Sequence, residues 1–357
     1  MTAARLVARC VHGLEPTLAA EVVGRELGVI TRIGHREVRF RLCGPPAEPR
    51  TADDVFLLAA ERPDIGAARD AVDALAELAD LADVDRLSRW RRRWAGAAAP
   101  AGVEVSASFL GRRNFNRYDA EDVVGAALAR RLGVGYHSRR AGTAPPPGYR
   151  GWRLTLDGER ATLMLRVTDR PLHRRAYKRR TIPGTLHPPL AAAMAAIADI
   201  RPGHHVIDPC CGAGTLLAEA AHLQPRAGLH GFDLDRTAVE AARTNAAGLP
   251  VTIERADAGR LPVPDGAADR VLCNPPWGGQ APARGALAAS LEPWWSELRR
   301  VLAPGGAAVV LLPDAEGLAA AVRQRLSPEH VQRVRVAGAQ PYVVQLHATA
   351  PHGRRGG

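Results

Sequence analysis

Aromatic residues and cysteines are scarce in this sequence, and long apolar runs are absent. Aromatic residues make up 4% of the 357 residues, so an aromatic side chain beside a motif carries unusual weight. The 5 cysteines are odd in number and form no C-x-x-C pair, which excludes a disulfide framework and a zinc site and indicates a reducing compartment. No stretch approaches the ~18 consecutive apolar residues of a membrane span. The start, "MTAARLVARCVHGLEP", has charges where a signal peptide needs an apolar core. We therefore expect a cytoplasmic protein with no bound metal and no membrane association.

Positive charge exceeds negative charge over the whole chain. There are 48 lysine and arginine residues against 37 acidic residues, for a formal net charge of +11. Lys178 is the single lysine, a usage that a GC-rich genome also produces, so we interpret only the positive sign. Such a basic protein is expected to associate with nucleic acid or another polyanion. The length predicts two domains.

The first half of the chain mixes strand and helix patterns. The strand pattern "VEVSASFL" is followed by the basic polar turn "GRRNFNRY", and then by a helix with Asp119 or Asp122 near its start. Two further strand patterns flank Asp157-Gly158, which predicts a hairpin. The basic connector "RPLHRRAYKRRTIPG" ends this half, and we place the domain boundary near residue 178.

The second half alternates short apolar strands with helical patterns. The strand patterns are "HHVIDP", "AGLHGFDLD", "VTIERADA", "DRVLCNPP" and "GAAVVLLPD". This alternation predicts a doubly wound, mostly parallel sheet, followed by two strands joined by a Gly-Ala-Gln-Pro turn. Ligands of such sheets bind at the carboxyl ends of the strands, so the residues that end these strands are the candidates for a site.

The first strand of this half ends in an acid and a glycine-rich turn, "VIDPCCGAGT". Gly212 and Gly214 lack a β-carbon, so a ligand can lie against the backbone there. The G-x-G-x-x-G pattern of a dinucleotide site is missing, and Asp208 would repel a phosphate. A cofactor with a cationic or amino-acid portion fits this turn better.

The next two strands also end in acids. Asp233 can accept hydrogen bonds from both hydroxyls of a ribose, while Asp235 is expected to cap the following helix. Asp257 can accept a hydrogen bond from the exocyclic amine of adenine. One acid at a strand end is often a cap or turn residue, but three at successive strands favour a nucleoside cofactor.

In this order the motifs resemble those of class I S-adenosylmethionine-dependent methyltransferases, over about residues 181 to 350. The resemblance implies Gly212 and Gly214 against the methionine part, Asp233 on the ribose and Asp257 at the adenine. The upstream segment "TLHPPLAAAM" resembles one that closes over the cofactor in amino-directed members, although His187 could equally cap a helix. The expected cofactor-binding residues are Thr185, His187, Asp208, Cys210, Gly212, Gly214, Thr215, Asp233, Asp257 and Ala258.

"NPPW" after the fourth strand resembles the (D/N)PP(Y/F/W) signature of methyltransferases that act on exocyclic amines of bases. Such an amine is a poor nucleophile, and two acceptors can orient it: the Asn274 side-chain oxygen and the Pro275 carbonyl. Pro275 and Pro276 fix the backbone, and Trp277 can stack on a flipped-out base. Cys273 precedes this motif and is interpreted as a small buried strand residue.

The N-terminal half resembles the THUMP module with its ferredoxin-like extension, over about residues 60 to 178. "CVHGLEPTLAAEV" also resembles the opening of THUMP-bearing guanine-N2 methyltransferases. Together these resemblances imply N2-methylation of guanosine in RNA, in tRNA before rRNA. An adenine-N6 methyltransferase and a non-catalytic RNA-binding protein are the alternatives. The expected RNA contacts are Arg112, Arg113, Arg117, Arg174 and Arg175.

The sequence thus predicts an α/β protein with two domains and a tail. Residues 1–178 are expected to form the α+β ferredoxin-like and THUMP region, and residues 179–350 a Rossmann-like methyltransferase domain with a seven-stranded sheet. Residues 351–357 are expected to be a flexible tail. S-adenosylmethionine is the expected cofactor, RNA the expected partner and a monomer the default state.

Overall fold

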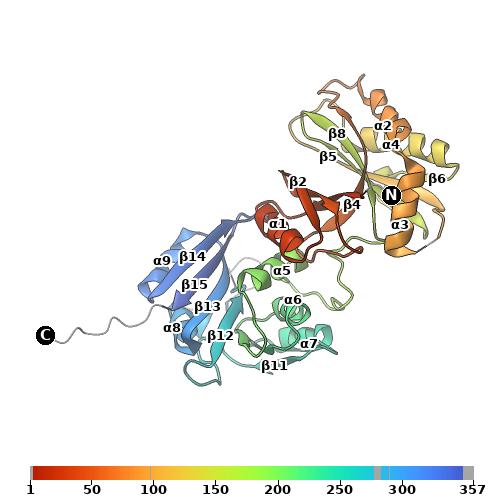
Figure 1. Ribbon diagram of the computed structural model, residues 1–357. Coiled ribbons are helices and arrows are strands. Elements are labelled where there is room, and N and C mark those ends of the chain that lie inside the picture. Colours follow the sequence, from red (N-terminus) through yellow and green to blue (C-terminus); the bar gives the residue numbers. More distant parts are fainter. Residues whose placement is uncertain (1–2, 97, 277–282, 289, 349–357) are drawn as a thin grey trace. The chain divides into compact units, whose positions relative to one another are not determined.

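The computed structural model describes residues 3–96, 98–276, 283–288 and 290–348, which form two compact units (Figure 1). Unit 1 comprises Met1–Arg9 and Ala19–Leu172, and unit 2 comprises Cys10–Leu18 and His173–Gly357. Cys10–Leu18 groups with unit 2 because its backbone is bonded there. The His12 carbonyl accepts a hydrogen bond from the Arg335 N–H at 2.9 Å. The single boundary near residue 178 stays a prediction, and the tail 351–357 lies outside the described residues.

Unit 1 is built on one eight-stranded sheet covered by helices. Its strands are β1 (Arg5–Arg9), β2 (Gly28–Gly34), β3 (Glu37–Leu42), β4 (Asp54–Pro63), β5 (Gly102–Phe109), β6 (Gly135–His137), β7 (Tyr149–Leu156) and β8 (Arg160–Arg166). Its helical segments are η1 (Val72–Ala76), α2 (Glu77–Leu81), α3 (Val84–Ala95), α4 (Arg117–Leu132) and η2 (Arg139–Ala141), and α1 (Glu15–Gly24) has residues in both units. The strand order is β2-β3-β1-β4-β8-β7-β5-β6. β5 pairs parallel with β6 and β7, whereas the other pairs are antiparallel, including the predicted β7–β8 hairpin at Asp157-Gly158.

Local hydrogen bonds define both ends of α4. The Asn116 side chain accepts from the Asp119 N–H, and the Asp119 side chain accepts from the Asn116 N–H, which is a reciprocal capping box. The acidic start predicted for this helix is therefore confirmed at Asp119. Gly133 ends the helix in the left-handed conformation, with φ of 65°. Because α4 packs on β5, the basic turn before it is held at the end of that strand.

Unit 2 contains the predicted seven-stranded, mostly parallel sheet. Its strands are β9 (His205–Asp208), β10 (Gly228–Asp233), β11 (Val251–Arg255), β12 (Ala268–Cys273), β13 (Leu302–Leu312), β14 (Leu326–Arg333) and β15 (Tyr342–Ala348). Its helical segments are α5 (Pro188–Ile197), α6 (Thr215–Leu223), α7 (Arg236–Asn245), η3 (Gly285–Ala288), α8 (Glu292–Val301) and α9 (Ala315–Arg323). The strand order is β11-β10-β9-β12-β13-β15-β14, and β15 is antiparallel to both neighbours. α5, α6 and α7 lie on one face of the sheet, and α8 and α9 on the other (Figure 1).

The strand order reverses at the centre of this sheet. The chain runs from β9 outward to β10 and β11, and then returns to β12 on the other side of β9. Such a reversal opens a crevice at the carboxyl ends of the two central strands. The residues that end β9, β10 and β12 therefore face a common space, which is where the sequence predicted a cofactor.

The connection between β14 and β15 differs from its prediction. The sequence predicts that the first strand continues up to a Gly-Ala-Gln-Pro turn at residues 338–341, but β14 ends at Arg333. Ala337 and Gly338 have φ of 49° and 84°, and an isolated bridge joins Val336 to Ala339. Two consecutive positive φ angles make a tight turn, so the strand ladder cannot continue through this stretch.

Candidate active site

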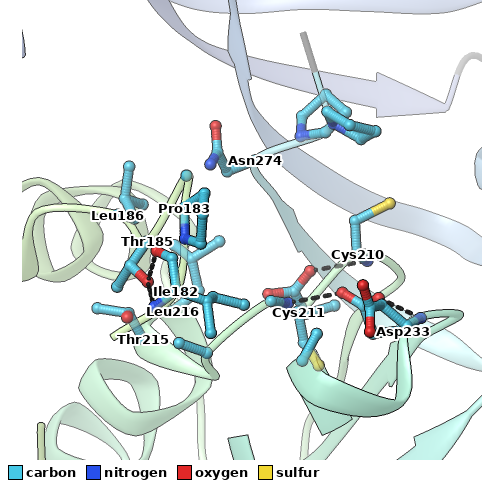
Figure 2. Close-up of a pocket in the computed structure, with 18 of the residues that line it drawn as sticks. Ile182, Pro183, Thr185, Leu186, Cys210, Cys211, Thr215, Leu216, Asp233 and Asn274 are labelled. Carbon is cyan, nitrogen blue, oxygen red and sulfur yellow. Dashed lines mark hydrogen bonds between the residues drawn. The ribbon is translucent and has the colours of Figure 1, made fainter. Parts of the chain in front are cut away.

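A cavity of about 690 Å³ lies at this crevice, and most of the predicted site residues line it. The predicted residues in its wall are Thr185, His187, Asp208, Cys210, Gly212, Thr215, Asp233, Asp257, Ala258, Asn274, Pro275 and Pro276. Figure 2 shows Asp233 near Cys210 and Cys211, and Thr185 near Ile182 and Pro183. Trp277 lies outside the described residues. The structure thus brings together side chains that are far apart in the sequence.

The two predicted glycines have different positions. Gly212 has φ of 52°, and a β-carbon added there would meet no atom within 4 Å, so its backbone faces open space. Gly214 is the N-cap residue of α6 with φ of 76°, and an added β-carbon would lie 3.2 Å from the Ala242 side chain. Gly214 is not part of the cavity wall. The glycine at this position permits close packing of α6 on α7, and its expected contact with the cofactor stays a prediction.

Asp208 is the most deeply buried acid of the cavity, with 1% of its surface exposed. One carboxylate oxygen, Oδ1, accepts from the Cys210 N–H at 3.1 Å, whereas Oδ2 has no hydrogen-bond donor among the described residues. Burial raises the pKa of Asp208 well above its ordinary value, and the nearby Asp233 raises it further. A buried acceptor without a donor is unfavourable, so the cavity is suited to a ligand that presents a cation or an N–H here.

Asp233 is fixed by two backbone donors at the end of β10. Its Oδ2 accepts from the Gly212 N–H and its Oδ1 from the Asp235 N–H, both at 2.9 Å. Each oxygen keeps a lone pair for a ligand hydroxyl. Burial raises the pKa of Asp233. Asp235 accepts from the Thr237 N–H at 2.8 Å, which confirms it as the cap of α7.

Asp257 is held by a segment that no motif indicated. Its Oδ1 accepts from the Gly259 N–H at 2.9 Å, and its Oδ2 from the Ala286 N–H at 3.0 Å. A β-carbon at Gly285, which has φ of 59°, would lie 2.2 Å from Asp257 Oδ2, so only glycine permits this approach. Arg284 pairs with Asp235 at 3.0 Å. The short segment around η3 therefore forms the part of the cavity wall between Asp233 and Asp257.

The segment before α5 supplies the opposite wall. Thr185 closes a turn by donating its hydroxyl to the Ile182 carbonyl at 2.6 Å and accepting from the Ile182 N–H at 2.9 Å. His187 precedes α5, but its side chain makes no capping hydrogen bond. The alternative that His187 caps a helix is confirmed by its position: His187 is the N-cap residue of α5, and its carbonyl accepts from the Leu190 and Ala191 N–H groups, both at 3.0 Å. Its ring lies 5.6 Å from that of His173.

Asn274 stands at the end of β12, in the cavity wall. In Figure 2 its side chain projects from the strand end, and no hydrogen bond joins it to the other residues drawn. The preceding Cys273 is fully buried, and burial raises the pKa of its thiol well above the ordinary value. Cys273 is thus confirmed as a buried strand residue, and a carboxamide and a proline backbone are the polar groups that β12 presents.

Several residues of the wall escaped prediction. They are apolar side chains and tight turns without a signature of their own: Ile182, Pro183, Leu186, Leu216, Leu234, Leu287, Leu311, Pro313, Val336, Ala337 and Ala339. The positive φ at Ala337 is a tertiary feature, because alanine carries no local signal for it. These residues give the cavity an apolar lining around its acids, as ligand sites usually have.

The five predicted RNA-contact arginines fall into two groups. Arg112, Arg117 and Arg174 are exposed. Arg113 is bound through Nη1 and Nη2 to the two carboxylate oxygens of Asp64, at 2.6 and 2.8 Å, and its side chain is 6% exposed. Arg175 pairs with the buried Glu219 at 2.9 Å. Both are held by internal carboxylates, and we withdraw them as phosphate contacts.

The Arg113–Asp64 pair leads to a stability prediction. We expect Arg113→Ala to lower the free energy of unfolding by about 3 kcal/mol, because it leaves Asp64 buried without its counter-charge. Burial by itself would raise the pKa of Asp64, but hydrogen bonds from Arg113, Gly158 and Gly66 outweigh it and lower the pKa. The stabilisation is therefore fully present above the pKa that Asp64 has in the unfolded chain, and it is lost as the pH falls through the pKa of Asp64 in the folded protein.

Denaturant unfolding at several pH values measures this effect. The matched control is Arg112→Ala, which removes the same charge from an exposed neighbour. Equal stability of the two variants at neutral pH would contradict the assignment of Arg113 to a structural pair.

Two features are absent from the described residues. None of their helices combines the length and apolar character needed to cross a membrane. Within the same residues, no group of three or more histidine, cysteine, aspartate or glutamate side chains is placed to hold a metal ion.

Comparisons with known proteins agree on a methyltransferase. The RMKL-like methyltransferase domain matches residues 175–342. A tRNA (guanine(6)-N2)-methyltransferase of Thermus thermophilus is 34% identical over 260 residues, which cover 71% of this chain and 74% of that protein. The U6 snRNA (guanine-N(2))-methyltransferase THUMPD2 of Mus musculus is 33% identical over 176 residues, and the match spans 46% of this chain and 33% of that protein.

A solved structure extends the match to both units. The crystal structure of TrmN from Thermus thermophilus aligns with a TM-score of 0.74 and 29% identity, and covers 97% of this chain and 99% of that one. The seven-stranded sheet, the strand-end acids and the sequence matches lead to one assignment. Residues 175–342 form an RMKL-like methyltransferase domain, and the chain belongs to the same methyltransferase family as the Thermus thermophilus tRNA (guanine(6)-N2)-methyltransferase.

Proposed function

We propose that this chain transfers a methyl group from S-adenosylmethionine to the exocyclic N2 of a guanosine in RNA. The observation that carries the proposal is the position of Asn274, which directly follows β12 in the wall of the cavity that also contains Asp208 and Asp233. The names of two relatives support the base and the atom, because both specify guanine N2. tRNA is favoured over rRNA because the relative aligned over 71% of this chain is named a tRNA methyltransferase.

The strand-end acids fit the proposed cofactor. Asp208 Oδ2, which has no donor among the described residues, would accept from the cofactor's amino group. Gly212 offers the open backbone beside the methionine part, Asp233 would accept from the ribose, and Asp257 from the adenine amine. When bound, S-adenosylmethionine supplies an electrophilic methyl group on its sulfonium.

The residues after β12 would orient the acceptor. Asn274 Oδ1 and the Pro275 carbonyl accept one N–H each from the guanine amine, which directs its nitrogen toward the methyl group. Neutral Asn274 is sufficient because the amine can release its proton after transfer. Pro275 and Pro276 restrict the backbone, and Trp277, outside the described residues, is proposed to stack on a flipped-out base.

Unit 1 is proposed to be a THUMP-type RNA-binding region. Exposed Arg112 and Arg117, together with Arg174 of unit 2, remain the candidate phosphate contacts from the sequence. The free state of all 5 cysteines fits the expected cytoplasmic site of action, and a monomer is the simplest form.

Nucleoside mass spectrometry of tRNA and rRNA from cells with and without the gene tests this function. We expect N2-methylguanosine to disappear from tRNA, and purified protein with S-adenosylmethionine to restore it. Loss from rRNA would support the ribosomal alternative, and N6-methyladenosine as the product would support the adenine alternative. RNA binding without S-adenosylmethionine binding would support a non-catalytic protein.

A further inference from the structure

Arg153 on β7 occupies an unusual electrostatic position in unit 1. It pairs in register with Ser106 on the parallel strand β5. Its Nη1 donates to the Ser106 hydroxyl at 3.4 Å and its Nη2 to the Ser108 hydroxyl at 2.7 Å. Both partners are neutral, and no carboxylate of the described residues forms an ion pair with Arg153 within 4 Å.

The arginines around it are placed differently. Arg9 pairs with Glu37 at 2.9 Å, Arg36 with Asp53 at 3.7 Å, and Arg139 with Glu121 at 3.7 Å. Arg166 on β8 pairs with Asp54 at 2.7 Å. Arg153 therefore has no carboxylate in ion-pair contact among the described residues, although the buried Glu121 attracts its charge from a greater distance.

Its charge is correspondingly unfavourable. Burial lowers the pKa of Arg153 to about 10, and repulsion from Arg9, Arg36 and Arg139 contributes. The residue is still charged at neutral pH. A largely buried cation with no carboxylate in contact lowers stability unless a ligand supplies the opposite charge.

The site has donors available for an anion. Arginine has five N–H donors, and Arg153 uses two on the serine hydroxyls. The Ser108 hydroxyl accepts from Arg153 and so keeps its proton to donate, whereas Ser106 donates to the Trp152 carbonyl at 3.3 Å. All three side chains belong to partly exposed residues, so a ligand can reach them. Guanidinium and hydroxyl donors side by side are suited to adjacent phosphate oxygens.

We propose that Arg153 and Ser108 form a phosphate-binding subsite that receives a backbone phosphate of the RNA substrate. The inference rests on the proposed function for the identity of that substrate. Arg112 follows Ser108 by four residues, on the exposed turn that leaves β5, and it extends the positive surface along the chain. The subsite positions RNA and takes no part in the methyl transfer itself.

Arg153→Gln tests the proposal, because glutamine removes the charge and retains an N–H donor for Ser108. We expect the dissociation constant for tRNA to rise about tenfold and the slope of log K against log salt to fall by about one. The midpoint of thermal unfolding should stay or rise, because an unfavourable buried charge is gone. S-adenosylmethionine affinity should stay unchanged. Arg41→Gln, an exposed arginine of β3, is the charge-matched control and should change tRNA affinity less than about twofold.

Three outcomes overturn the proposal. In the first, Arg153→Gln keeps the tRNA affinity and salt slope of the wild type. In the second, Arg153→Gln loses tRNA affinity together with a lower unfolding midpoint. In the third, Arg41→Gln loses as much tRNA affinity as Arg153→Gln. Ser108→Ala is the second variant, and it should weaken tRNA binding with an unchanged midpoint. Inorganic phosphate distinguishes the source of the anion. If it stabilises the wild type but not Arg153→Gln while tRNA binds both equally, the site serves free phosphate and the RNA assignment is wrong.

Failure of the proposed function can be distinguished from failure of the subsite. A wild-type protein that methylates no RNA contradicts the proposed function, whereas a methylating enzyme whose Arg153→Gln variant binds tRNA normally contradicts the subsite alone.

Discussion

Asn274→Ala should lower the rate of methyl transfer by roughly 10²–10³-fold while S-adenosylmethionine binding persists. The estimate is taken from the loss of one preorganised hydrogen-bonding group in other active sites. Asn274 directly follows β12 in the cavity wall, and its carboxamide has no hydrogen bond to the other residues drawn in Figure 2. Truncation should therefore remove the orienting acceptor without disturbing the sheet. Single-turnover methylation of a tRNA transcript measures the rate, and calorimetry measures cofactor binding.

Asn274→Asp is the matched variant, because it keeps an acceptor oxygen at the same position and matches the other form of the signature. We expect it to retain much more activity than Asn274→Ala. If alanine and aspartate variants were equally impaired, or if the alanine variant kept full activity, Asn274 would not orient the amine.

Asp208→Asn should weaken S-adenosylmethionine binding by about 10- to 100-fold, the range expected when a hydrogen bond to a charged group is lost. Oδ2 of this carboxylate is buried without a donor among the described residues, which fits a cofactor ammonium as its partner. Calorimetric titration with S-adenosylmethionine measures the affinity. Asp265→Asn, an exposed acid with 83% of its side chain accessible, is the charge-matched control. Unchanged affinity in Asp208→Asn would contradict the proposed role.

The same variant should stabilise the protein without cofactor. Burial raises the pKa of Asp208 in the folded state above its unfolded value. At a pH between the unfolded and the folded pKa of Asp208, the folded chain binds more protons than the unfolded chain. The free energy of unfolding therefore falls as the pH rises from the unfolded pKa to the folded pKa. Asp208→Asn removes that fall, and thermal unfolding at a series of pH values above the ordinary aspartate pKa measures it. For the same reason, cofactor affinity of the wild type should increase with pH.

The site residues that could be predicted are those whose position depends on neighbouring residues in the sequence. Alternating strands and helices form a parallel sheet in which the carboxyl ends of the strands lie on one side. A residue at the end of an apolar strand is therefore expected on that side, independently of distant parts of the chain. Asp208, Asp233, Asp257 and Asn274 could therefore be assigned to one cavity before any coordinate was known, and all four line it. The cap at Asp235 was equally local.

Charged side chains with distant partners could not be assigned in this way. Arg113 was a plausible phosphate contact by its neighbours in the sequence, yet it is bound to Asp64, 49 residues earlier. Arg153 attracted no notice within its strand pattern, because the arginines and the distant Glu121 that surround it are brought there only by the tertiary fold.

The sequence by itself determined the class of sheet, the order of the motifs and the four residues that face the cavity from strand ends. The tertiary structure alone decided that Gly214 packs on Ala242, that Ala286 holds Asp257, and which arginines remain available to RNA. The physical reason is range. Backbone periodicity acts between neighbours in sequence, whereas burial, charge pairing and close packing depend on residues that only folding brings within a few ångströms.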